Sequence, residues 1–173
     1  DLRELVRGTV DWETLEAIAR ALAERSDREV VRIEFMEADN WLSTPLVVDE
    51  EWFVKVITPQ NARVHGVLTG ARNLGMFSSG TEGFFSRFDG PVEMGEHEIE
   101  ATRRMREIGL DAPEPLEVFE AQGLGVVVLE YLEDYRTLED LEAEELDGVA
   151  AATAAALATM HEHGLAHGDF REE

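Results

Sequence analysis

One lysine and one motif near the C-terminus are the features of this sequence best suited to chemistry. The chain has 173 residues, 15 of them basic, and Lys55 is the single lysine. A lysine offers a compact charge on a flexible stem, and arginine is a poor substitute where that charge must reach a phosphate or a carboxylate. The motif LATMHEHGLAHGD ends in Asp169. A carboxylate in such a loop can orient a hydroxyl group and accept its proton.

Hydrophobic patterning predicts the elements that position these residues. Residues 1–29 are predicted to be helical, and a change to alternating apolar residues then indicates strands. The last helix is apolar on nearly every face, which predicts burial on most sides. The fold class is therefore α+β, with two hairpins and one helix between the third and fourth strands. The predicted strands are 30–35, 45–48, 52–57, 115–119 and 124–129, and the later helices are 96–108 and 146–163.

The composition excludes several classes of function. A net charge of −23 argues against a nucleic-acid-binding surface, because phosphates would be repelled. The absence of cysteine excludes a disulfide framework, an iron–sulfur site and a thiolate zinc site, and it fits a reducing cytoplasm. No apolar run is long enough to predict a membrane span. An acidic chain poor in lysine is typical of proteins from extreme halophiles, so most of the charge indicates adaptation to salt.

Several segments resemble kinase-fold phosphotransferases when they are taken in chain order. LATMHEHGLAHGD resembles the catalytic loop in its HGD form, as found in RIO-type atypical protein kinases, the small kinases of the KEOPS complex and aminoglycoside phosphotransferases. WFVKV resembles the strand that carries the phosphate-binding lysine, and HEIEATRRMREIGL resembles the αC helix. LEYLED resembles the hinge, and MEADNWLST lies where a phosphate-covering loop belongs.

This resemblance implies a role for each candidate residue. Lys55 would bind the α- and β-phosphates of ATP, and Glu98 would be its ion-pair partner. Glu100 is the alternative partner, since a shift of two residues turns a side chain by about 200° around a helix. Asp169 would be the catalytic aspartate. The other implied nucleotide-binding groups are the side chain of Asn40 and the backbone of Glu130 and Leu132.

Departures from the family pattern affect the finer assignment. The loop 36–44 has no glycine, but EADNW resembles the EANVY segment of RIO-type kinases, which favours that group. Position 53 is phenylalanine where those kinases usually keep alanine. Because Phe53 shares a strand face with Lys55, it is expected to narrow the nucleotide pocket or to reposition the base. The insert 58–95 is longer than an ordinary kinase needs and is a candidate lid or partner surface.

The resemblance implies a protein-kinase-like N-lobe, with a five-stranded antiparallel sheet and the αC helix, followed by the first helices of a C-lobe. The expected boundaries are a helical segment 1–29, the N-lobe 30–129 with its insert, and the hinge with the start of the C-lobe at 130–173. The ligands of Mg²⁺ or Mn²⁺ are expected beyond residue 173, so these residues alone are expected to be inactive.

The predicted function is that of a RIO-like serine/threonine protein kinase or ATPase. Two alternatives stay open: a kinase that phosphorylates the hydroxyl group of a small molecule, and a non-catalytic module that binds nucleotide.

Overall fold

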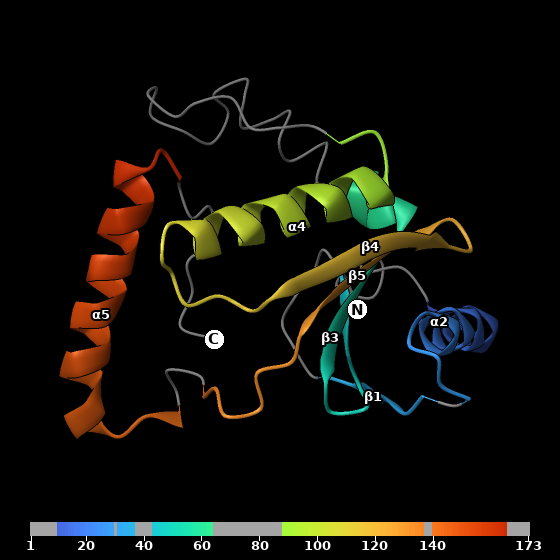
Figure 1. Ribbon diagram of the computed structural model, residues 1–173, viewed down its shortest axis with the longest axis horizontal. Helices are drawn as coiled ribbons and strands as arrows, with labels where there is room; N and C mark the ends of the chain where they lie inside the picture. Colours follow the sequence, from blue (N-terminus) through green and yellow to red (C-terminus); the bar gives the residue numbers. More distant parts are fainter. Residues whose placement is uncertain (1–9, 30, 37–42, 64–87, 137–139, 166–173) are drawn as a thin grey trace.

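The computed structural model describes residues 10–29, 31–36, 43–63, 88–136 and 140–165. Within these ranges two long helices pack on opposite faces of one antiparallel sheet, and a third stands apart from it (Figure 1). The helices are α2 (Trp12–Arg25), α4 (Pro91–Glu107) and α5 (Ala143–Glu162). The strands are β1 (Ile33–Phe35), β2 (Thr44–Val48), β3 (Trp52–Ile57), β4 (Pro115–Ala121) and β5 (Leu124–Glu130).

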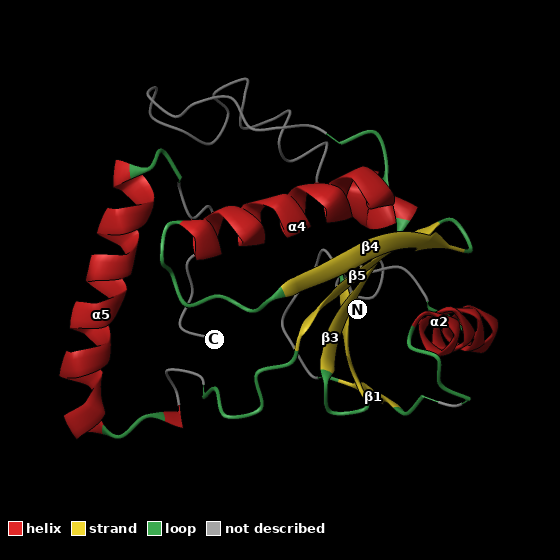
Figure 2. Cartoon of the chain, in the orientation of Figure 1, coloured by secondary structure: helices red, strands yellow, loops and turns green. Residues whose placement is uncertain are grey.

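The sheet has five strands in the order β1-β2-β3-β5-β4, and every neighbouring pair is antiparallel (Figure 2). The hairpin β2-β3 turns at Asp49 and Glu50, and the hairpin β4-β5 turns at Gln122 and Gly123. All four turn residues have positive φ values, and in the two-residue turn of β4-β5 these values match the twist of the flanking strands. The predicted α+β class with a kinase-like N-lobe sheet is therefore confirmed.

Both faces of the central strands are covered, which explains why β5 is an almost unbroken apolar run. Successive side chains of a strand point to opposite faces. On the α2 face, the core contains Ile18 and Leu22 of α2 together with Val54 and Val126. On the α4 face, a smaller cluster contains Ile99 of α4 with Ile57, Val127 and Leu129 of the central strands. Lys55 alternates with Val54 and Val56 along β3, so its side chain lies on the α4 face.

Helix α2 is capped at its start and connected to the sheet at its end. The Asp11 carboxylate caps α2 by accepting a hydrogen bond from the Thr14 amide at 2.9 Å. Just after the helix, the Arg28 guanidinium pairs with Asp49 and with Glu51, at 2.5 Å in each case. The same guanidinium lies over the Trp52 ring, 4.8 Å from its centroid. These contacts connect the end of α2 to the β2-β3 hairpin.

Asp49 is expected to stabilise the fold in a pH-dependent way. Burial alone would raise the pKa of Asp49, but the hydrogen bond from the Arg32 amide and the pairing with Arg28 outweigh it and lower the pKa. A lowered folded-state pKa adds stability above the unfolded value of about 4, and this contribution is lost as the pH falls further. We expect Asp49→Asn to cost about 1 kcal/mol at pH 7. Urea unfolding of both proteins from pH 7 to pH 3 tests this, and a difference that stays constant with pH would contradict it.

Two helices differ from the sequence-based prediction. Helix α4 begins at Pro91, so it includes residues 91–95 that the pattern assigned to the preceding insert. Proline has no amide hydrogen to donate. At the first helical position a backbone amide has no partner within the helix, so proline is well tolerated there. Helix α5 was predicted to be buried on most sides, yet Met160 is its one buried residue. Periodicity shows that a face is apolar but does not show what covers it.

In the described part of the chain, no helix has both the length and the apolar character needed to cross a membrane.

Candidate nucleotide site

Lys55 lies in the middle of β3, on the face of the sheet that α4 covers. Its neighbours across the sheet are Pro45 in β2 and Val127 in β5. The lysine side chain is 23% exposed, so most of it is shielded from water. Nζ lies 5.6 Å from the centroid of the Phe53 ring, two residues earlier on the same strand. The position thus holds a partly buried cation beside an aromatic ring.

Helix α4 supplies the carboxylate that pairs with this cation. The Lys55 ammonium forms an ion pair and hydrogen bond with Oε1 of Glu98. The Glu98 side chain is 27% exposed, and the buried residues Ile99 and Thr102 lie on the neighbouring positions of the same helix. An ion pair that is partly shielded from water is stronger than one on an open surface. The pair therefore links α4 to the centre of the sheet.

The alternative partner, Glu100, points elsewhere. Its carboxylate accepts a hydrogen bond from Arg103 at 2.8 Å, and its side chain is 62% exposed. A residue two positions after Glu98 lies about 200° around the helix, so the two carboxylates cannot both face β3. Of the two open candidates, Glu98 is the one that meets Lys55.

Two glycines allow α4 to lie close enough to the sheet for this pairing. A Cβ atom at Gly95, one turn before Glu98, would lie 2.8 Å from methyl groups of both Val118 and Val127. A Cβ atom at Gly125 would lie 2.7 Å from the carbonyl carbon of Pro91, at the start of α4. Neither glycine was predicted from the sequence to be part of the site. The available signal was a glycine just before the predicted helix and another inside a predicted buried strand.

The predicted hinge follows β5 directly. The Glu130 amide donates to the Glu114 carbonyl, and the Tyr131 amide donates to the Glu51 carbonyl, both at 2.9 Å. The Glu114 amide bonds to the Glu130 side chain instead of to its carbonyl. Within the described ranges, the Glu130 carbonyl and the Leu132 amide take part in no backbone hydrogen bond. One acceptor and one donor, two residues apart, therefore have no backbone partner where the resemblance expects an adenine edge.

The comparison with known families gives a match that agrees with the resemblance described above. Residues 91–172 match the family model of the RIO domain. Over this segment, just under half of the chain, the sequence resembles the RIO domain. The RIO domain is that of atypical protein kinases and ATPases, which bind ATP and transfer its phosphoryl group. The matched segment begins at the first residue of α4 and includes Glu98 and the hinge, whereas Lys55 precedes it. Comparison with curated proteins and with solved structures finds no significant match.

Not every predicted site residue of this RIO-like chain can be placed. Asn40 and Asp169 lie outside the described residues. The nucleotide-binding roles of Lys55, Glu98 and the hinge stay predictions, although the geometry brings the first two together. In the described part of the chain, no group of three or more histidine or acidic residues could hold a metal ion.

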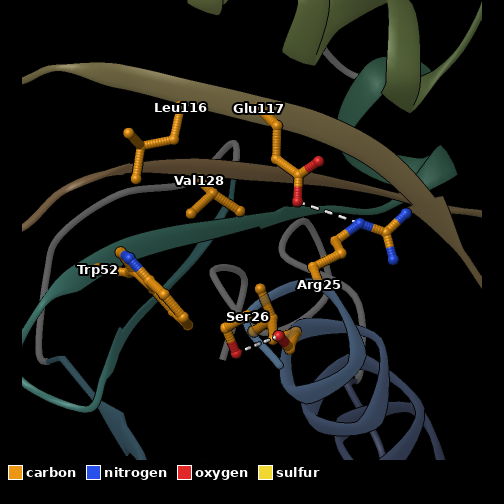
Figure 3. A pocket seen from close by; sticks show the side chains of 7 residues that line it. Arg25, Ser26, Trp52, Leu116, Glu117 and Val128 are labelled. Carbon is orange, nitrogen blue, oxygen red and sulfur yellow. Dashed lines mark hydrogen bonds and ion pairs between the residues drawn. The ribbon is translucent and has the colours of Figure 1, made fainter. Parts of the chain in front are cut away.

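A cavity on the other face of the sheet is separate from this site. It has a volume of about 330 Å³ and lies between the end of α2 and strands β3, β4 and β5 (Figure 3). Arg25 at its edge pairs with Glu117 at 3.0 Å. Its walls include Trp52 and Val128, which alternate along their strands with Phe53 and Leu129 of the Lys55 face. The sheet thus separates the cavity from the Lys55–Glu98 pair.

Proposed function

We propose that the protein is an ATP-dependent phosphotransferase of the RIO type that acts on serine or threonine hydroxyls of a protein, or that turns over ATP as a conformational switch. One observation carries the proposal: the only lysine of the chain forms an ion pair with Glu98 of α4. The match to the RIO domain over residues 91–172 supports it independently, because Lys55 lies outside the matched segment.

Each candidate residue has a distinct task in this proposal. Lys55 holds the α- and β-phosphates of the substrate ATP, and Glu98 fixes the position of the ammonium. The Glu130 carbonyl and the Leu132 amide bind the edge of the base. The hydroxyl oxygen of the acceptor forms a bond to the γ-phosphorus while the bond to the bridging oxygen breaks, and ADP leaves. Asp169 orients the hydroxyl and accepts its proton, and Asn40 faces the phosphates.

The metal belongs to the same proposal. When bound, Mg²⁺ or Mn²⁺ would neutralise charge on the phosphates of ATP. The expected domains are, in chain order, a helical segment at 1–29, an N-lobe at 30–129, and the hinge with the start of a C-lobe at 130–173. The net charge of −23 and the rarity of lysine support a salt-rich cytoplasm as the location. The same charge disfavours nucleic acid as a partner.

The proposal is tested by ATP binding and turnover of the full-length protein in 2 M KCl. We expect Lys55→Met to weaken ATP binding and to lower turnover by at least about 100-fold, because the phosphates lose their cationic ligand. We expect Asp169→Asn to lower turnover to a similar extent while ATP still binds. Undiminished turnover in both variants would overturn the residue assignments. Better activity in dilute buffer than in 2 M KCl would overturn the interpretation of the charge.

A further inference from the structure

Phe53 lies between the two ends of the candidate nucleotide site. It faces the same side of β3 as Lys55, and its ring centroid is 5.6 Å from the lysine Nζ. Across the sheet it pairs with Leu129, the residue just before Glu130. The ring packs partly against the cluster of Ile57, Ile99, Val127 and Leu129, and the side chain remains only half-buried. It therefore offers an aromatic surface that its packing holds in place.

The strand register shows how far apart the hinge and Lys55 lie along β3. Trp52 pairs with Glu130, so the hinge lies beside the start of β3. Lys55 is three residues further along, which is roughly 10 Å at the rise of a β-strand. A nucleoside phosphate that bonds to the hinge and to Lys55 spans this interval along the α4 face. Phe53 is the β3 residue on that face within the interval, so the ligand must pass over its ring.

We propose that Phe53 is the stacking surface for the nucleobase and makes the site selective for ligands with a planar base. The inference rests on the proposed function, because it concerns the same site. A planar ring that covers an aromatic side chain gains attraction beyond its apolar contact area. The half-buried state of Phe53 favours this role, since the packed part fixes the ring and the remainder can contact a ligand. The ring then shares the binding of the ligand with the hinge, which contacts the edge of the base, and with Lys55, which contacts the phosphates.

The test compares two ligands on the full-length protein by calorimetry: ADP with Mg²⁺, and pyrophosphate with Mg²⁺, which has no base. Phe53→Leu keeps an apolar side chain but removes the aromatic face, and we expect ADP to bind it about 5- to 10-fold more weakly. Phe53→Tyr, which keeps the ring, is expected to bind ADP as the natural protein does. Pyrophosphate should bind the natural protein and both variants alike, because its contacts are with Lys55.

Each other outcome overturns the inference in a distinguishable way. If Phe53→Leu binds ADP equally well or more tightly, the ring is an obstacle or a bystander, while the proposed function stands. If ADP and pyrophosphate weaken together, Phe53 acts through Lys55 and does not contact a base. If the natural protein binds neither ligand, the inference and the proposed function fail together.

Discussion

Replacing Gly125 by alanine is expected to lower the free energy of unfolding by about 2–3 kcal/mol. The added Cβ would lie 2.7 Å from the carbonyl carbon of Pro91 and 3.1 Å from the amide nitrogen of Val92. These are backbone atoms at the first turn of α4, so no side-chain rotation can relieve the overlap. The helix must move away from β5, or the strand must bend. Urea unfolding followed by circular dichroism measures the loss.

Two other glycines serve as controls for this prediction. At Gly95 the added atom would meet methyl groups of Val118 and Val127, which can shift, so we expect a smaller loss of about 1 kcal/mol. At Gly148 in α5 no heavy atom lies within 4 Å of the added Cβ. Alanine there favours the helix, and stability should stay the same or rise by up to about 1 kcal/mol. A loss at Gly148 as large as that at Gly125 would show that close approach of α4 is not the cause.

The strands of the sheet could be predicted because their signals are local. The predicted strand 52–57 agrees with β3, and the predicted strands 115–119 and 124–129 agree with β4 and β5 apart from their last residues. The start of α4 could not be read in the same way. Residues 91–95 were assigned to the preceding insert, whereas Gly95 is buried in the helix against Val118 and Val127. Those partners lie more than 20 residues away in sequence, so the reason for the glycine is tertiary.

The site was predicted unevenly for a similar reason. Lys55 stands out by its rarity, and the family resemblance implied Glu98 as its partner with Glu100 as the alternative, on the opposite side of the helix. The hinge groups are backbone atoms, and no side-chain pattern tells whether they are free. At Glu130 the Glu114 amide bonds to the side chain instead of the carbonyl, next to a register shift between Pro115 and Glu117. Such a shift is a property of the assembled sheet.

The carboxylate of Glu98 is expected to matter far more for turnover than that of Glu100. Glu98→Gln keeps the size of the side chain but removes the charge that holds the Lys55 ammonium. Displacement of a positioning group by about 1 Å can cost about 100-fold in rate, and we expect kcat/KM of the full-length protein to fall by about that factor. The Lys55 and Glu98 side chains are each about one quarter exposed, so the change also leaves a mostly buried ammonium without its partner and is expected to lower thermal stability. Turnover is therefore compared at a temperature at which both proteins are folded.

Glu100→Gln is the matched control, because it makes the same chemical change on the same helix. Its carboxylate pairs with Arg103 on an exposed surface, and such pairs contribute little. We therefore expect turnover within about twofold of the natural protein. Equal losses in the two variants would indicate a general effect of acidic charge on α4. A loss confined to Glu98→Gln requires that α4 acts on the phosphates through Lys55, and so it ties the close packing at Gly95 and Gly125 to activity.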